Sequence, residues 1–155
     1  MTILATVRPH SWDLAVFVHV IGAMTLVGGL ITAAAAGIVG WRDAGGGLRR
    51  FSALTLFGVA FPGWIVMRVG AQWAYAREGW DNVPDKLQPT WLGIGYLTAD
   101  IGGLVLLIAL VLGGIGLRRA RSGRGARLLR ASTALAAILI AVYVVSVWAM
   151  GGKPS

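Results

Sequence analysis

Hydrophobic residues fill four long stretches of the chain, and short polar segments separate them. The stretches cover residues 12–40, 51–75, 91–117 and 128–150. Each exceeds the ~20 residues that an α-helix needs to cross ~30 Å of hydrocarbon. No alternation typical of a β-barrel is visible, and helices satisfy their own backbone groups in lipid. The pattern predicts an all-α polytopic membrane protein, in which residues 1–155 form one domain, a bundle of four transmembrane helices.

The composition supports a membrane protein and excludes several kinds of site. Only 13% of the residues are charged, about half the share found in soluble domains. Because the chain has no cysteine, thiol chemistry, disulfides, iron–sulfur clusters and cysteine-based zinc or copper sites are excluded. The net charge of +8 sits mostly in two connections, where membrane topology explains it. We therefore expect no nucleic-acid partner.

Basic residues are concentrated in the first and third connections, whereas the middle connection mixes both signs. The positive-inside rule therefore places these two connections in the cytoplasm and both chain ends outside. We expect the third connection to contact anionic lipid head groups as well. Its arginines are Arg118, Arg119, Arg121, Arg124, Arg127 and Arg130. Four tryptophans are expected to form an aromatic belt at the outer interface, namely Trp12, Trp80, Trp91 and Trp148. A cleaved signal peptide is the alternative for the first stretch, but its apolar run exceeds the usual 7–15 residues.

Three ionisable residues, His19, Arg68 and Asp100, interrupt three of the apolar stretches. A charged side chain in the membrane centre costs at least ~2.5–3.5 kcal/mol, so such residues persist where they are paired, hydrated or functional. Counted at ~1.5 Å per residue from the outer helix ends, all three lie roughly 10–14 Å below the outer surface. We expect Arg68 to pair with Asp100. The pair either fixes the register of two antiparallel helices or builds a ligand, proton or ion site.

Helical spacing extends this cluster. Residues that share a helix face with Arg68 are Trp64, Gln72 and Tyr75. Tyr96 shares the face of Asp100, and Tyr143 lies at the same depth on the fourth stretch. The predicted ligand-binding residues are therefore His19, Arg68, Gln72, Tyr96, Asp100 and Tyr143.

Glycine and proline predict where helices pack closely or bend. Gly29, Ala33 and Gly37 form a ridge of small residues, which favours close helix packing within the bundle or between protomers. Pro62 and Gly63 should kink the second stretch and free a backbone carbonyl.

The segment HVIGAMTLVGG, residues 19–29, resembles the first-helix pattern of a superfamily of bacterial membrane proteins. The pattern is similar to that of the DUF2269-type four-helix proteins and, more distantly, of CopD copper exporters and HemJ-type protoporphyrinogen oxidases. The segments AFPG (60–63) and WLGIGY (91–96) fit the same layout. The resemblance implies a four-helix fold in a bacterial cytoplasmic membrane. It also places His19 at the position of a haem ligand in the HemJ-like group, although no second helix-borne histidine or lysine is evident.

These observations favour a small membrane protein that binds a ligand, with haem b or another tetrapyrrole preferred. Arg68 would pair with an acidic group such as a propionate, His19 would ligate or relay protons, and Asp100 would orient Arg68. One alternative is an accessory or assembly subunit of a membrane complex, and a homo-oligomer is also expected. A proton-coupled transporter or channel that uses Asp100 is the third hypothesis. No nucleophile–base pair or metal cage favours an enzyme.

Overall fold

The computed structural model describes residues 10–42, 46–120 and 122–152, without the side chains of residues 10–12 and 85. Its elements, in chain order, are α1 (His10–Val39), η1 (Gly40–Arg42), α2 (Gly47–Thr55), η2 (Leu56–Ala60), α3 (Phe61–Arg77), η3 (Trp80–Asn82), η4 (Asp85–Leu87), α4 (Thr90–Ala120) and α5 (Ala126–Gly152). No β-strand occurs among these residues.

Four helical spans are long and apolar enough to cross a membrane, as the hydropathy pattern predicted. They cover Asp13–Arg42, Gly47–Arg77, Thr90–Ala120 and Ala126–Gly152. The second span is continuous through α2, η2 and α3. The fold is therefore an all-α bundle of a multi-pass membrane protein that contacts the lipid bilayer. Most spans extend beyond the apolar stretches because charged residues such as Arg49 and Arg118 continue the helices.

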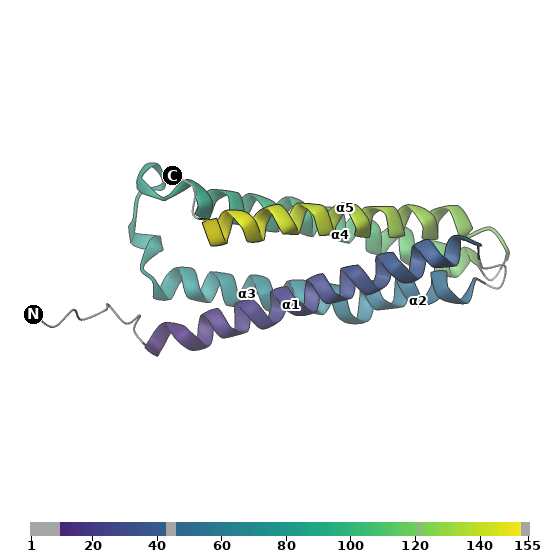
Figure 1. Cartoon of the computed structure of the whole chain (residues 1–155), viewed down its shortest axis with the longest axis horizontal. Helices are drawn as coiled ribbons and strands as arrows, with labels where there is room; N and C mark the ends of the chain where they lie inside the picture. The colour runs from purple at the N-terminus through teal and green to yellow at the C-terminus, as the bar shows by residue number, and fades with distance from the viewer. Residues whose placement is uncertain (1–9, 43–45, 121, 153–155) are drawn as a thin grey trace, which may run out of the picture.

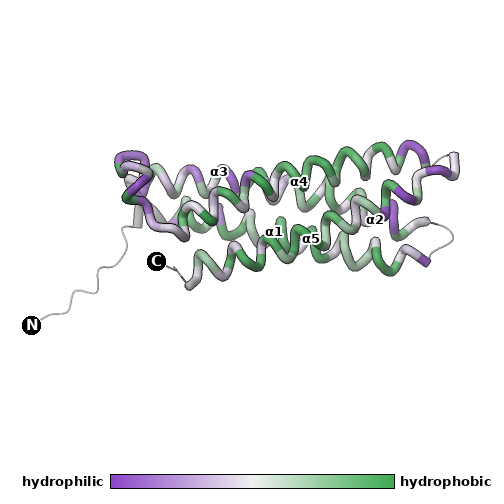
Figure 2. The backbone as a smooth tube through the Cα atoms, turned by 90° about the horizontal axis from the view of Figure 1, so that it is seen from above, coloured by the Kyte–Doolittle hydropathy of each residue, from purple (hydrophilic) through white to green (hydrophobic). Residues whose placement is uncertain are grey.

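The helices form two close pairs, α1 with α3 and α4 with α5 (Figure 1). We call the end formed by residues 40–42, 46–50, 118–120 and 122–130 the arginine end, and the end that carries residues 78–89 the loop end. Figure 2 shows hydrophobic residues in the middle of the bundle and hydrophilic residues towards both ends. Helices α3 and α4 approach each other at few positions, and we call the strip between them the α3–α4 seam.

Glycines bring α1 and α3 into direct backbone contact. A Cβ atom on Gly29 of α1 would lie 2.8 Å from the backbone nitrogen of Ala60, the last residue of η2, which continues into α3. A Cβ atom on Gly63 of α3 would lie 2.5 Å from the nitrogen of Leu26. Because no side chain fits there, the two helices pack through their backbones, as small residues allow in membranes. The predicted ridge of small residues thus packs inside the bundle.

Buried hydroxyl groups join four helices near the arginine end. Ser52 of α2 donates to the carbonyl oxygen of Ala33 in α1 at 2.7 Å, and its oxygen lies 3.3 Å from that of Thr133 in α5. Ser132 of α5 donates to the carbonyl oxygen of Ala109 in α4 at 2.7 Å. Towards the loop end, an apolar layer follows, in which Leu26, Leu30, Leu56, Leu106 and Leu139 are fully buried.

The irregularity predicted at Pro62 takes the form of a π-helical turn. Residues Leu56–Ala60 adopt this turn directly before the Phe61–Pro62 step, and the N–H of Phe61 donates to the carbonyl oxygen of Leu56. Proline has no N–H to continue the regular pattern, and short π-helical turns inside α-helices are one of the known causes of bending.

Candidate functional site

The α3–α4 seam holds an ion pair between Arg68 and Asp100. The Nη2 atom of Arg68 lies 2.6 Å from Oδ1 of Asp100. The guanidinium group also lies over the ring of Tyr96, 5.1 Å from its centroid, where the face of the ring attracts a cation. The structure therefore brings together three of the six predicted site residues, one from α3 and two from α4.

This ion pair faces outwards from the bundle. The side chain of Asp100 is 59% exposed and that of Arg68 is 29% exposed. Within the described part of the chain, neither side chain makes a second ion pair or a side-chain hydrogen bond. Four of the five N–H donors of Arg68 and the second carboxylate oxygen of Asp100 are thus left for a group outside the chain.

The ion pair lies far from the arginine end along both helices that carry it. Along α4, the rise from Arg119 to Asp100 is about 28 Å at ~1.5 Å per residue. Along the second span, the rise from Arg50 to Arg68 is about 27 Å. With Arg50 and Arg119 at one boundary of a hydrocarbon core ~30 Å thick, the ion pair would lie near the opposite boundary. The expected depth of roughly 10–14 Å below the outer surface stays a prediction.

Aromatic and amide side chains close the α3–α4 seam above and below the ion pair. Trp64 donates from Nε1 to the carbonyl oxygen of Ala99 at 3.2 Å. Tyr75 meets Tyr96 edge to face, with 5.4 Å between the ring centroids. Gln88, from the segment after η4, donates to the Tyr75 hydroxyl at 2.9 Å. These contacts fix Tyr96 below the guanidinium group and tie the connecting segment to the helices.

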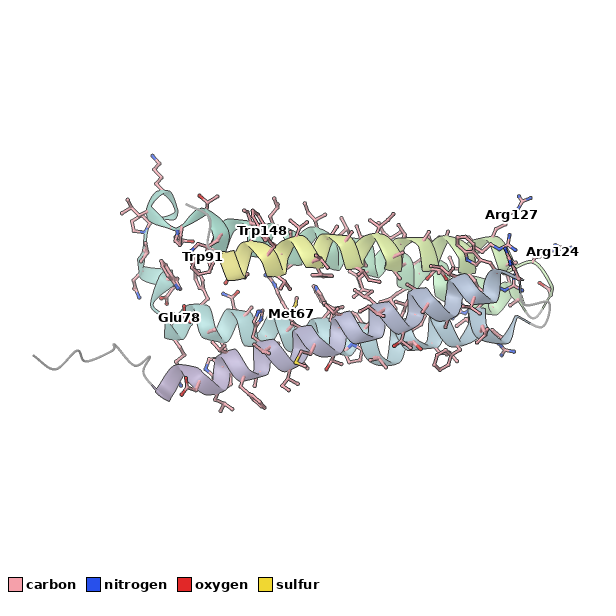
Figure 3. The ribbon with its side chains drawn as sticks, viewed as in Figure 1. Met67, Glu78, Trp91, Arg124, Arg127 and Trp148 are labelled. Carbon is pink, nitrogen blue, oxygen red and sulfur yellow. The ribbon has the colours of Figure 1, made fainter. Side chains whose placement is uncertain are left out.

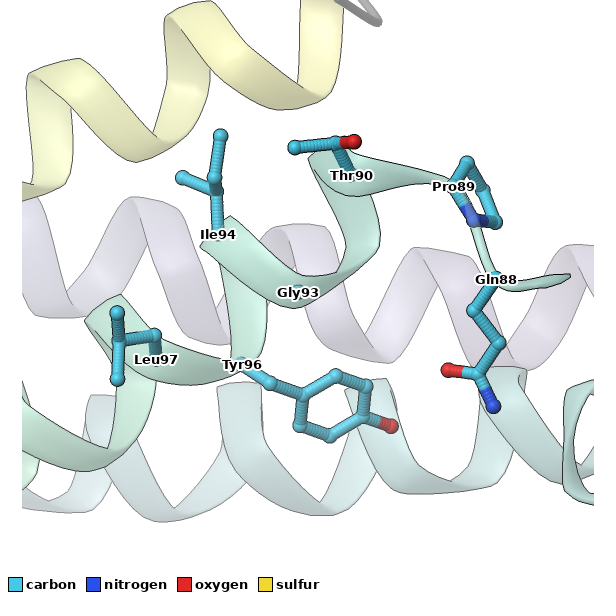
Figure 4. A pocket seen from close by; sticks show the side chains of 7 residues that line it. All are labelled: Gln88, Pro89, Thr90, Gly93, Ile94, Tyr96 and Leu97. Atoms are coloured by element: carbon cyan, nitrogen blue, oxygen red, sulfur yellow. The ribbon is translucent and has the colours of Figure 1, made fainter. Parts of the chain in front are cut away.

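A shallow groove of about 610 Å³ runs over the start of α4 (Figure 4). The groove is lined by Gln88, Tyr96 and Leu97, among others. Gly93 lies at its floor, where an added Cβ would meet nothing within 4 Å. Asp100 follows Gly93 and Leu97 on the same face of the helix, at intervals of four and three residues. The groove thus leads from the loop end towards the ion pair.

His19 lies at the α1–α3 contact and does not join the ion pair. Its Nδ1 atom is 3.0 Å from the carbonyl oxygen of Met67. Because a carbonyl oxygen only accepts, Nδ1 carries the proton of this bond, and Nε2 remains an acceptor or ligand atom. The described residues contain no group of three or more His, Cys, Asp or Glu side chains that would hold a metal ion.

Two further predicted residues lie apart from the ion pair. Gln72 is exposed on α3 and makes no side-chain hydrogen bond in the described structure. Tyr143 is 5% exposed and packs against Gly102 of α4. Its hydroxyl group is buried without a hydrogen-bond partner. Tyr143 was expected at the depth of the ion pair, but it does not contact the pair, because its phenol ring lies in the α4–α5 interface.

The arginine end carries the predicted basic residues. Arg124 and Arg127 extend from this end, whereas Glu78, Trp91 and Trp148 mark the loop end (Figure 3). Arg118 and Arg119 close α4 and are exposed, and Arg130 donates from Nη2 to the carbonyl oxygen of Trp41 at 3.1 Å. Arg121 and the side chain of Trp12 lie outside the described residues.

The predicted aromatic belt has described members at the loop end. The rings of Trp80 and Trp91 meet edge to face at 6.2 Å, and Trp80 donates to the carboxylate of Glu78 at 2.9 Å. Trp148 is 65% exposed, as expected of a ring at a membrane interface.

Two groups of polar contacts were not predicted. Gln88 joins the connecting segment to Tyr75, and Ser52, Ser132 and Thr133 bond between helices. A signal for the second group existed, because hydroxyl side chains in membrane helices commonly bond across to neighbours. Gln88 carried no such signal beyond its position before Pro89.

No protein-family model, curated protein or solved structure matches this chain. Membership of the DUF2269-type family therefore stays a prediction, and the site has to be interpreted from its own geometry.

Proposed function

We propose that this protein binds the polar head of an amphiphilic ligand at the Arg68–Asp100 ion pair. The observation that carries the proposal is the exposure of Asp100, and the partial exposure of Arg68, on the outer side of the α3–α4 seam. Under the proposed topology, with the arginine end in the cytoplasm, the site opens to the outer leaflet of a bacterial cytoplasmic membrane.

Energetics support a ligand rather than bare lipid tails next to this pair. An ionised side chain in contact with hydrocarbon costs several kcal/mol unless another polar group meets it. Near the membrane boundary, an amphiphile supplies a polar head at the level of the ion pair and apolar chains alongside the helices. Arg68 offers several N–H donors in a planar arrangement, which suits phosphate or carboxylate oxygens.

Haem or another tetrapyrrole remains one candidate ligand. His19 would hold the haem iron through Nε2, because its Nδ1–H donates to a backbone carbonyl. When bound, haem would supply redox chemistry. Arg68 would hold an acidic substituent, but no hydrogen bond links Arg68 to His19. A visible spectrum of the purified protein tests this ligand. A Soret band that disappears in His19→Ala would support haem as the ligand. A protein that gains no bound haem when it is titrated with haemin would exclude haem.

An accessory subunit is the second candidate function. The same exposed Asp100 would then meet a basic side chain on a membrane helix of a partner or of a second copy. A stoichiometric partner that co-purifies with the wild type and is lost in Asp100→Asn would support this function over ligand binding.

A proton-coupled transporter or channel is the third hypothesis, and the core gives it less support. The fully buried leucines, among them Leu30, Leu106 and Leu139, separate the ion pair from the hydroxyl groups near the arginine end. No described polar side chain bridges this layer. A proton flux into liposomes that Asp100→Asn abolishes would restore this hypothesis.

Native mass spectrometry tests the proposed function directly. We expect protein extracted in mild detergent to retain one co-purified amphiphile per chain after the bulk lipids are removed. Arg68→Gln should lose it, whereas Arg77→Gln, the same change at an exposed position of α3, should retain it. Because Arg68→Gln leaves Asp100 without its partner, the double variant Arg68→Gln/Asp100→Asn serves as a second test. Full retention by the folded double variant would overturn the proposal.

A further inference from the structure

We infer that the ligand of the Arg68–Asp100 site is zwitterionic: a phospholipid head group that carries a phosphate and a primary ammonium group. This inference rests on the proposed function and specifies the ligand class. It follows from the charge, the remaining hydrogen-bonding atoms and the apolar surroundings of the ion pair.

The ion pair is electrically neutral and isolated from other charges along its own helices. Between Arg50 and Arg77, Arg68 is the only charged residue, and between Thr90 and Arg118, Asp100 is the only one. The neighbouring α5 carries no charged residue beyond Arg130 in its described part. Any selectivity for ligand charge at this site therefore comes from these two side chains.

A purely anionic head group would satisfy only half of the site. The phosphate would accept hydrogen bonds from the remaining N–H donors of Arg68. The negative charge of the phosphate would then lie beside the carboxylate of Asp100, whose Oδ1 is 2.6 Å from Nη2 of the same guanidinium group. Two negative charges bound to one guanidinium group lie close together and repel, and the repulsion is strong where water is scarce. A single cation would repel Arg68 in the same way.

A zwitterionic head group meets both side chains with opposite charges. Its phosphate oxygens would accept from Arg68, and its ammonium group would donate to the free carboxylate oxygen of Asp100. A primary ammonium has the N–H donors that this bond needs, whereas a quaternary ammonium has none. The nearest aromatic face, that of Tyr96, is already covered by Arg68 at 5.1 Å, so it is not free to bind a quaternary ammonium through its ring.

The surface next to Asp100 suits the acyl chains of such a lipid. From Asp100 towards the arginine end, α4 exposes Ile101, Leu104, Ile108 and Val111. These residues repeat at intervals of three and four and form one apolar strip. Towards the loop end, the groove over Gly93 lies between Leu97 and Gln88. A polar head at the ion pair would thus have its chains on the apolar strip.

Competition between three phospholipids tests the inference. Detergent-purified protein is mixed with equimolar phosphatidylethanolamine, phosphatidylcholine and phosphatidylglycerol that carry the same acyl chains, and bound lipids are counted by native mass spectrometry. We expect phosphatidylethanolamine to be preferred about tenfold over each of the others, as the loss of one charge-assisted hydrogen bond predicts. Asp100→Asn should reverse the order in favour of phosphatidylglycerol, while Asp81→Asn, an exposed acid of η3, should change nothing. Soluble glycerophosphoethanolamine in excess should displace the lipid if the head group alone is recognised, whereas lack of displacement shows that the membrane lipid is the ligand.

Failure of this inference is distinguishable from failure of the proposed function. If Arg68→Gln abolishes lipid retention but the wild type binds phosphatidylglycerol as well as phosphatidylethanolamine, the site binds amphiphiles and the zwitterion inference is wrong. If Asp100→Asn leaves the preference unchanged, the inference is also wrong. If all three lipids bind equally to the wild type and to the Arg68→Gln/Asp100→Asn variant, both proposals are overturned.

Discussion

Replacement of Gly29 by alanine should destabilise the bundle, whereas the same change at the adjacent Gly28 should not. The new Cβ at position 29 would lie 2.8 Å from the backbone nitrogen of Ala60, while at position 28 nothing lies within 4 Å. Ordinary contact begins at about 3.4 Å, so α1 and η2 must separate locally by about 0.6 Å (3.4 minus 2.8). A gap of 0.5–1 Å already forfeits a quarter to a half of the dispersion energy of the atoms that it separates, and overpacking typically costs about 1–3 kcal/mol.

The two variants share every other effect of the substitution. Both replace glycine by alanine in α1, and both gain the same intrinsic helix propensity, up to about 1 kcal/mol in water. The difference between their free energies of unfolding therefore isolates the contact between α1 and η2. We expect Gly29→Ala to be about 1–3 kcal/mol less stable than Gly28→Ala in reversible SDS unfolding, followed by circular dichroism. Equal unfolding midpoints for the two variants would refute the backbone contact between α1 and η2.

Three further predictions concern the core and the topology. Ser132→Ala removes one hydrogen bond to the carbonyl oxygen of Ala109 and should cost about 0.6–1.7 kcal/mol in the same unfolding assay; an unchanged stability would contradict the bond. Tyr143→Phe removes a buried hydroxyl group that has no partner, so its stability should stay equal or rise by up to about 1 kcal/mol, and a clear loss would reveal a bound group. Because the chain has no cysteine, the single variants Asn82→Cys and Ser122→Cys can report its topology. A membrane-impermeant maleimide should label Asn82→Cys and not Ser122→Cys in intact cells. Labelling of Ser122→Cys alone would show that the orientation is reversed.

The spans could be predicted from the sequence because lipid imposes a single strong requirement. Any segment that crosses the hydrocarbon must be apolar and must satisfy its own backbone, and the four stretches meet this requirement without other candidates. The helix ends were harder to predict. Arg49 and Arg118 continue their helices, since a charged residue near a membrane boundary can extend to the interface without ending the helix.

The residues of the site could be predicted only in part. The depth of a residue and its face on a helix do not determine which neighbouring helix its side chain contacts. The pairing of Arg68 with Asp100 followed from two opposite charges at one depth on consecutive antiparallel helices. His19 lies at a similar depth, but the glycine contact holds α1 against α3, where Met67 supplies a partner for its imidazole. Tyr143 was separated from the ion pair in the same way, by the α4–α5 interface.

The contrast between the helix interfaces explains why the α3–α4 seam is the place where a ligand can bind. Helix α1 meets α3 through backbone atoms at Gly63 and meets η2 at Gly29, so any inserted group would have to break that packing. Across the α3–α4 seam, contact is made instead by long side chains such as Trp64 and Arg68. Side chains change rotamer far more readily than packed helices separate. A head group that binds the remaining donors of Arg68 and the free oxygen of Asp100 therefore needs only local side-chain movement, while the paired helices on both sides keep the site in place.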